Sequence, residues 1–352
     1  MQELIPTIPY DVALNCLARV PRSYHSTLSQ VSNPIRSLLS SPFFYDVHSA
    51  LHGKQTMLYF SVNYPESNDV HWFMVNLDDP DPLLRLPLIP SLTFRPSTMC
   101  ALVNHDIYVI GGYSGDALSP EVWILDCRFN RWRQGPSMHI PRDKGKVTVL
   151  DRKIYVFGEE ELGQQSGIVG EVLDTVVGSW KVIMILESSA DGSPLTSDLI
   201  FNKMKEASKK IVSPPPGLGN WPTWMNRVLY SYVDGSLPTI LAHELTQDGT
   251  WVQKTVRGSY SLVPSGVNPV MAKAKTKSAA RELFLLWLCH KSTKPPEYNE
   301  DFADICCLKI EIKKSKDGQL YAIVCDGGVC QFYSYSFITD GCSIQQCFAL
   351  QI

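Results

Sequence analysis

The apolar positions at the start of the chain follow the period of an α-helix. Between residues 8 and 20, the apolar residues at the spacing of one helical face are Val12, Ala13, Cys16, Leu17 and Val20. Pro9 suits the first turn of a helix, because the backbone N–H that proline lacks would form no hydrogen bond there. Asp11 suits the positive end of the helix dipole. The pattern therefore predicts a helix that begins near Pro9.

Two shorter helical segments are expected after Pro21. The apolar positions of the second segment, at i, i+4 and i+7, are Tyr24, Leu28 and Val31. Asn33 is expected to cap the third segment, with Pro34 at its first helical position and its end at residues 41–42. Three short helices over about forty residues bury little surface by themselves. Such a unit either docks on the rest of the chain or is completed by a partner.

After Leu51 the pattern changes to short aromatic and β-branched runs separated by Gly, Pro, Asn and Asp, which predicts strands and turns. These runs lie at residues 57–62, 72–77, 107–110, 122–125, 146–150, 154–157 and 180–185. Their lengths are those of strands in a sheet protein. In contrast, the prolines at 214–216 and the lysine-rich run at 273–277 predict loop insertions.

The predicted strands recur with a period of 47 to 49 residues. Pairs one period apart are Tyr108 and Tyr155, Gly111 and Gly158, and Trp132 and Trp180. A weaker copy precedes them, with Tyr59 placed 49 residues before Tyr108. A fixed period of this size indicates a stacked or radial architecture, and about six such units fit residues 49–352.

The helical segment resembles the F-box over residues 8–11, 16–21, 28–32 and 36–43. The resemblance implies three helices that pack on a Skp-type adaptor, which joins the receptor to a cullin and a RING subunit. The adaptor-binding residues it implies are Ile8, Pro9, Asp11, Leu17, Val20, Pro21, Leu28, Val31, Ile35 and Leu39. The family usually has an aromatic residue at the position of Ile35, so the smaller side chain predicts an adaptor affinity weaker by about 1 kcal/mol.

The repeat resembles kelch, whose units of about fifty residues each form one four-stranded propeller blade. Two clear copies lie at 91–138 and 139–186, and the match fades beyond about residue 185. The kelch structural residues are Tyr108, Gly111, Gly112, Trp123, Trp132, Tyr155, Gly158 and Trp180. The glycines permit close backbone approach, and the aromatic residues are expected to pack in the core instead of binding a ligand.

Together these features predict an α+β multidomain chain, with a short three-helix F-box at 1–48 and an all-β kelch-like propeller at 49–352. The propeller is expected to have about six blades, several of them degenerate. An F-box followed by kelch units is typical of a large plant group of F-box/kelch-repeat proteins, and this chain resembles them.

Composition narrows the classes of partner. The 32 Lys and Arg residues balance 35 Asp and Glu residues, so there is no electrostatic reason to expect nucleic acid. No secretory signal or membrane-spanning apolar run is apparent, which predicts a cytoplasmic or nuclear protein with no membrane partner. The ten cysteines are expected to be reduced thiols, and their spacing predicts no metal site and no cofactor.

The expected function is that of a non-catalytic substrate receptor of an SCF-type (Skp-cullin-F-box) ubiquitin ligase. The F-box would bind the Skp-type adaptor, and the propeller would bind an unknown target protein. One alternative is a kelch interaction scaffold without a ligase role. A less favoured alternative is a propeller oxidase that binds copper through Tyr and His, although no motif marks such a site.

Overall fold

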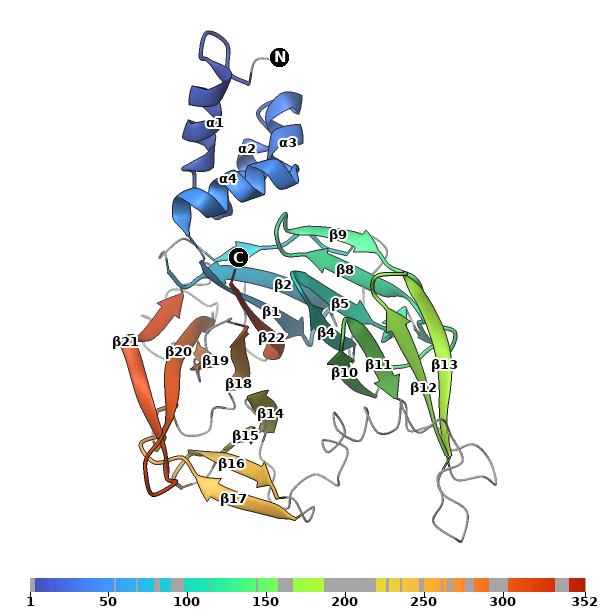
Figure 1. Cartoon of the computed structure of the whole chain (residues 1–352), viewed down its shortest axis with the longest axis vertical. Coiled ribbons are helices and arrows are strands. Elements are labelled where there is room, and N and C mark those ends of the chain that lie inside the picture. The colour runs from blue at the N-terminus through green and yellow to red at the C-terminus, as the bar shows by residue number, and fades with distance from the viewer. Residues whose placement is uncertain are drawn as a thin grey trace.

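The computed structural model consists of a helical unit followed by a β-propeller (Figure 1). It describes residues 4–53, 55–67, 69–78, 83–89, 98–114, 116–143, 145–157, 167–186, 220–225, 228–234, 236–246, 250–260, 262–264, 267, 269–275, 282–290, 303–332 and 342–351. None of the helices in these ranges is long and apolar enough to span a bilayer.

The helical unit has one more helix than the sequence pattern predicts. Its elements are α1 (Tyr10–Ala18), the 3-10 helix η1 (Arg22–Tyr24), α2 (His25–Leu28), α3 (Asn33–Leu39) and α4 (Pro42–His52). The third segment was expected to end at residues 41–42. The Ser41 hydroxyl instead accepts a hydrogen bond from the Phe44 N–H at 3.2 Å, and Pro42 follows in the first turn. The residues that end α3 therefore also begin α4.

Two local expectations shift by a few residues. The cap of α3 is Ser32, whose side chain accepts from the Ile35 N–H at 3.3 Å, and Asn33 is already helical. The helical unit continues to His52, and the first strand begins at Thr56, so residues 48 and 49 lie inside α4. The change from helix to strand follows Gly53, whose φ of 71° ends α4 at a conformation that glycine adopts easily.

The described strands form five blades of four strands, and neighbouring strands of a blade are joined by backbone hydrogen bonds. Blade 1 consists of β22 (Ser343–Gln351), β1 (Thr56–Tyr64), β2 (Asp69–Asn76) and β3 (Leu84–Arg85). Blade 2 consists of β4 (Met99–Val103), β5 (Asp106–Ile110), β8 (Val122–Asp126) and β9 (Arg131–Gln134). Blade 3 consists of β10 (Lys146–Leu150), β11 (Lys153–Phe157), β12 (Gly167–Asp174) and β13 (Ser179–Leu186).

The second half of the chain forms two further blades. Blade 4 consists of β14 (Asn220–Met225), β15 (Val228–Val233), β16 (Thr239–Leu245) and β17 (Trp251–Thr255). Blade 5 consists of β18 (Val270–Lys275), β19 (Glu282–His290), β20 (Ala303–Lys314) and β21 (Leu320–Phe332). A two-stranded hairpin of β6 (Tyr113–Ser114) and β7 (Ala117–Leu118) extends from blade 2. The blades are arranged in a ring (Figure 1).

The last strand, β22, joins the two ends of the propeller. It pairs with β1 in antiparallel register from Thr56 to Asn63, and Ala274 and Lys275 of β18 pair with it in parallel. Blade 1 therefore contains strands from both ends of the chain, and blade 5 is tied to it by backbone hydrogen bonds.

The hydrophobic core lies between consecutive blades. Phe60 and Phe73 of blade 1 pack with Phe284 of blade 5 in one buried cluster. Separate clusters lie between blades 4 and 5, between blades 1 and 2, and between blades 2 and 3. Within the described residues, each blade packs on at least one neighbour, as expected of a radial repeat that buries the faces of its sheets.

The propeller expected from the repeat is confirmed, and one feature of it is corrected. Each predicted strand overlaps an observed strand, and the bounds differ by at most three residues, the largest difference being at the start of β2. The basic run is not wholly a loop, because residues 273–275 belong to β18, where strand pairing takes precedence over charge. Some expectations fall outside the described residues, namely those for residues 276–277, 214–216 and Gly158. Residues 187–219, between blades 3 and 4, also lie outside them, and the expected count of about six blades depends on this segment.

Candidate functional site

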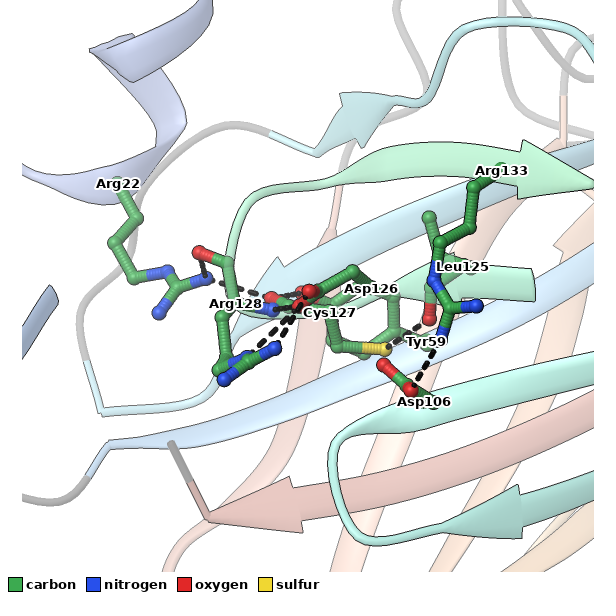
Figure 2. A network of polar contacts seen from close by, with 8 residues as sticks. All are labelled: Arg22, Tyr59, Asp106, Leu125, Asp126, Cys127, Arg128 and Arg133. Atoms are coloured by element: carbon green, nitrogen blue, oxygen red, sulfur yellow. Dashed lines mark hydrogen bonds and ion pairs between the residues drawn. The ribbon is translucent and has the colours of Figure 1, made fainter. Parts of the chain in front are cut away.

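The helical unit contacts the propeller through one buried arginine. Arg22, in η1, is only 6% exposed, and its guanidinium Nη2 donates to the carbonyl oxygens of Cys127 and Arg128 at 2.6 and 2.5 Å. Both carbonyl groups belong to the turn between β8 and β9 (Figure 2). Hydrogen bonds from a charged donor are the stronger kind, so this contact fixes the helical unit against blade 2.

The β8–β9 turn is itself held rigidly. The fully buried Tyr59 of β1 approaches it, with its hydroxyl as donor 2.7 Å from both the Cys127 carbonyl oxygen and Asn130 Oδ1. Asp126 accepts two hydrogen bonds from the Arg128 guanidinium, at 3.0 and 2.7 Å (Figure 2). Burial raises the pKa of Tyr59 well above its usual value, so the hydroxyl keeps its proton and remains a donor.

Aromatic packing adds to the docking contact. Tyr45 of α4 lies edge-on to both His105 and Phe129, with ring centroids 6.3 Å apart in each case. His105 belongs to the turn between β4 and β5, and Phe129 belongs to the β8–β9 turn. The helical unit therefore packs on the turns at one end of blade 2.

A cluster of three histidines stabilises the helical unit from inside. The His48 ring stacks on His52 at 4.3 Å and meets the edge of His25 at 5.0 Å. Burial lowers the pKa of His25 to about 4 and that of His48 to about 3. Both rings are therefore neutral at physiological pH, and this cluster acts as aromatic packing.

The helical unit also leaves apolar side chains in solvent. Six of the seventeen exposed large apolar side chains of the described residues lie in this unit, and they are Ile8, Val12, Tyr24, Val31, Phe43 and Leu51. Val31 is 66% exposed and Val12 is 46% exposed. An apolar concentration of this kind marks an interaction surface.

The structure divides the apolar residues of α1 into two stripes. The core of the helical unit consists of Leu4, Ala13, Leu14, Leu17, Ala18, Ile35, Leu38, Leu39 and Phe44. Val12 and Cys16, which the sequence pattern placed on the same face as Ala13 and Leu17, are exposed instead. The one-residue offset arises because apolar residues occupy nearly every position from 12 to 18, so periodicity alone does not choose the buried stripe.

The expected adaptor-binding residues consequently fall into three groups. Ile8, Pro9, Asp11 and Val31 are exposed, and Val20, Pro21 and Leu28 are partly buried. Leu17, Ile35 and Leu39 are buried in the core of the helical unit, with exposed fractions of 5%, 4% and 8%. In this structure these three side chains lie inside the helical unit and not on its surface. The weaker adaptor affinity expected from Ile35 stays a prediction.

The kelch tryptophans lie between blades. Trp132 of blade 2 donates its indole N–H to the Pro87 carbonyl oxygen of blade 1 at 2.9 Å. One repeat later, Trp180 of blade 3 donates its indole N–H to the carbonyl oxygen of Pro136 at 2.7 Å, and Pro136 lies just after the last strand of blade 2. Trp123, Tyr108 and Tyr155 lie on the strands of these blades. The same contact therefore recurs with the repeat period.

The double glycine is required by its surroundings. Gly111 and Gly112 have φ angles of 67° and 88°, and the Gly112 N–H donates to the Arg142 carbonyl oxygen at 2.7 Å. A Cβ on Gly111 would lie 2.2 Å from that same oxygen. This position accepts only glycine without a shift of the backbone.

Sequence reasoning missed the residues that dock the two units. Arg22 and Tyr45 belong to no repeat or periodic pattern in the sequence, because the residues that they contact are more than fifty positions away. Tyr59 had a signal, because it precedes the repeat tyrosine Tyr108 by 49 residues. Glu171 was also missed; it is fully buried and accepts from the backbone N–H groups of His139 and Ile140 at 2.8 and 2.9 Å.

Within the ranges that the structure describes, no group of three His, Cys, Asp or Glu side chains is placed to hold a metal ion.

Comparisons with known proteins agree with the division into a helical unit and a propeller. A family model described as the F-box domain matches residues 5–46, and one described as FKB95, Kelch-repeats domain, matches residues 72–325, which is more than half of the chain.

The relatives found are F-box/kelch-repeat proteins of Arabidopsis thaliana. One is 32% identical over 252 residues, which are 66% of this chain and 62% of that protein. A second is 27% identical over 358 residues, 91% of this chain and 87% of that protein. A third, named as putative, is 34% identical over 51% of this chain and 48% of that protein. The match thus spans less than two thirds of the first and third of these relatives.

Proposed function

This chain belongs to the family of F-box/kelch-repeat proteins, and on that premise we propose that it is the substrate-recognition subunit of an SCF-type ubiquitin ligase. The F-box binds a Skp-type adaptor, and through it a cullin and a RING subunit. The kelch propeller binds the target protein. The observation that carries the proposal is the set of exposed apolar side chains on a helical unit that is already docked on the propeller through Arg22.

The adaptor surface consists of the exposed residues of the helical unit. Ile8 and Val12 are four residues apart, and Val31 lies in the turn between α2 and α3. Burial of an exposed valine or isoleucine side chain contributes about 1.5–3 kcal/mol, so a few such residues supply much of a specific interface. The other expected residues that are exposed or partly buried complete the proposed surface, and they are Pro9, Asp11, Val20, Pro21 and Leu28.

The target is expected at the end of the blades away from the helical unit. In blade 2, Asp106 pairs with Asp126 beside the docked turn, whereas Ile110 pairs with Val122 at the far end of the same strands. The β6–β7 hairpin extends from this far end and exposes Leu118. Loops carried on a rigid scaffold are the usual place for recognition.

The proposed mechanism is proximity. The propeller holds a target close to the ubiquitin-loaded conjugating enzyme that the RING subunit recruits, which raises the effective concentration of the reacting lysine. The chain supplies no reactive group to this transfer. A scaffold role without ubiquitin transfer is the alternative, and adaptor binding separates the two.

The test is binding of the full chain to a purified plant Skp-type adaptor, measured by size-exclusion chromatography. Val12→Asp and Val31→Asp are expected to abolish co-elution, because each places a charge in an apolar interface. The matched control is Val252→Asp, at a valine of blade 4 that is 39% exposed. Adaptor binding by the Val12 and Val31 variants at the level of the control would refute the proposed surface.

A further inference from the structure

A cavity of about 160 Å³ lies where the helical unit meets blades 1 and 2. Four arginine side chains line it: Arg22 from η1, Arg85 from β3, and Arg128 and Arg131 from the β8–β9 turn and β9. At about 30 Å³ for each water in the liquid, the cavity has room for roughly five waters or a small ligand group.

Arg22 lies in this cavity wall without an acidic partner. Its contacts are with neutral groups, namely two backbone carbonyl oxygens and the Tyr45 ring 5.9 Å away. Its Nε atom is buried and makes no hydrogen bond, and no carboxylate pairs with it in the described part of the chain. A charge that is 94% buried in this way is costly unless an opposite charge compensates it.

The neighbouring charges do not supply that compensation. The Arg128 guanidinium is neutralised by Asp126, to which it donates two hydrogen bonds. Arg85 donates to His71 Nδ1 at 2.7 Å, and burial lowers the pKa of His71, which keeps that ring neutral. Among the described residues, neither Arg85 nor Arg131 forms an ion pair.

The buried Arg22 and the exposed Arg85 and Arg131, none of which forms an ion pair within the described residues, therefore line one small cavity. We propose that this cavity binds a phosphate monoester group, presented by a small metabolite or by a phosphorylated side chain. Guanidinium groups donate paired, parallel hydrogen bonds that match the oxygens of a phosphate, and a dianion offers enough charge for more than one of them. Asn130 and the Ser26 side chain add neutral polar groups to the wall.

Occupancy of this site would couple the two units of the chain. The ligand would contact η1 on one side and β3 and β9 on the other, so its binding would tighten the docking of the helical unit on the propeller. The site is formed jointly by the helical unit and the propeller of one chain, so its existence does not depend on adaptor binding.

The experiment is isothermal titration calorimetry of the full chain at low salt with three probes. They are inorganic phosphate, phenyl phosphate and a phosphoserine peptide, with the unphosphorylated peptide as a blank. Arg131→Gln and Arg85→Gln are the main variants because neither side chain holds the two units together. Arg133→Gln is the matched control, since Arg133 is paired with Asp106 at 2.8 Å and does not line the cavity.

Each of the two variants is expected to weaken binding about tenfold, the change for one lost charge-assisted hydrogen bond, and the control is expected to match the wild type. Preference for phenyl phosphate would support a small ester, and preference for the phosphopeptide would support a phosphorylated protein segment. Absence of binding by all three probes, or equal binding by wild type and both variants, would overturn the proposal. A failure here leaves adaptor co-elution unchanged, so it is distinguishable from failure of the proposed function.

Discussion

Arg22→Met is expected to loosen the helical unit from the propeller without unfolding either. The substitution keeps most of the apolar stem and removes two hydrogen bonds, of 2.6 and 2.5 Å, to the β8–β9 turn. A hydrogen bond to a charged group contributes about 1.5–3 kcal/mol. The Cys127 carbonyl oxygen keeps Tyr59 as a donor, and removal of a buried charge returns part of its desolvation cost. A net loss of about 2 kcal/mol is therefore expected.

Hydrogen–deuterium exchange measures this loss directly. A change of about 2 kcal/mol raises the population of the undocked state about 30-fold, so amides of the β8–β9 turn and of η1 should exchange faster by that factor. The blade cores should keep their protection. Arg19→Met is the control, because Arg19 is exposed on the same helical unit. Unchanged exchange in the β8–β9 turn of the Arg22 variant would show that this contact does not dock the two units.

Three further outcomes follow from the packing. Leu17→Ala should lower the free energy of unfolding of the helical unit by about 2–4 kcal/mol in urea titrations, because it creates a cavity in its core; a change below about 0.5 kcal/mol would place that side chain at the surface. Gly111→Ala should destabilise the propeller more than Gly178→Ala, since both have positive φ but only the first Cβ would meet a carbonyl oxygen, at 2.2 Å; equal melting temperatures would contradict this. The pKa values of His25 and His48 in the folded chain are about 4 and about 3, below the unfolded value of 6.5. Because the unfolded chain binds protons first as the pH falls, their contribution to stability is complete above pH 6.5 and is lost as the pH falls toward the folded values. A helical unit equally stable at pH 7 and pH 4.5 would contradict that sign.

The blade architecture could be predicted because it repeats. Tyr108, Gly111 and Trp132 each have a counterpart one period later, and the interblade bond of Trp132 recurs at Trp180. Contacts between blades can be predicted in this way because the same local residues recur at a fixed period. Strand β22 carries no clear copy of the repeat, so its place in blade 1 depended on long-range pairing that the pattern does not encode.

The helical unit shows where pattern reasoning stops. Apolar residues cover two sides of α1, so spacing indicated a helix but not which stripe faces inward. It grouped Val12 with Leu17, of which only Leu17 is buried. Ser41 and Pro42 are compatible with both the end of one helix and the beginning of the next. The Arg22 contact spans 105 residues and joins a side chain to backbone carbonyl groups, which have no sequence signature at all.

On the proposed function, the helical unit uses one side for its own propeller and offers the other to the adaptor. The decisive experiment is hydrogen–deuterium exchange of the full chain, with and without a purified Skp-type adaptor. We expect slower exchange around Val12 and Val31 and no change in the β8–β9 turn. Protection confined to the β8–β9 turn, or no protection anywhere in the helical unit, would contradict this account.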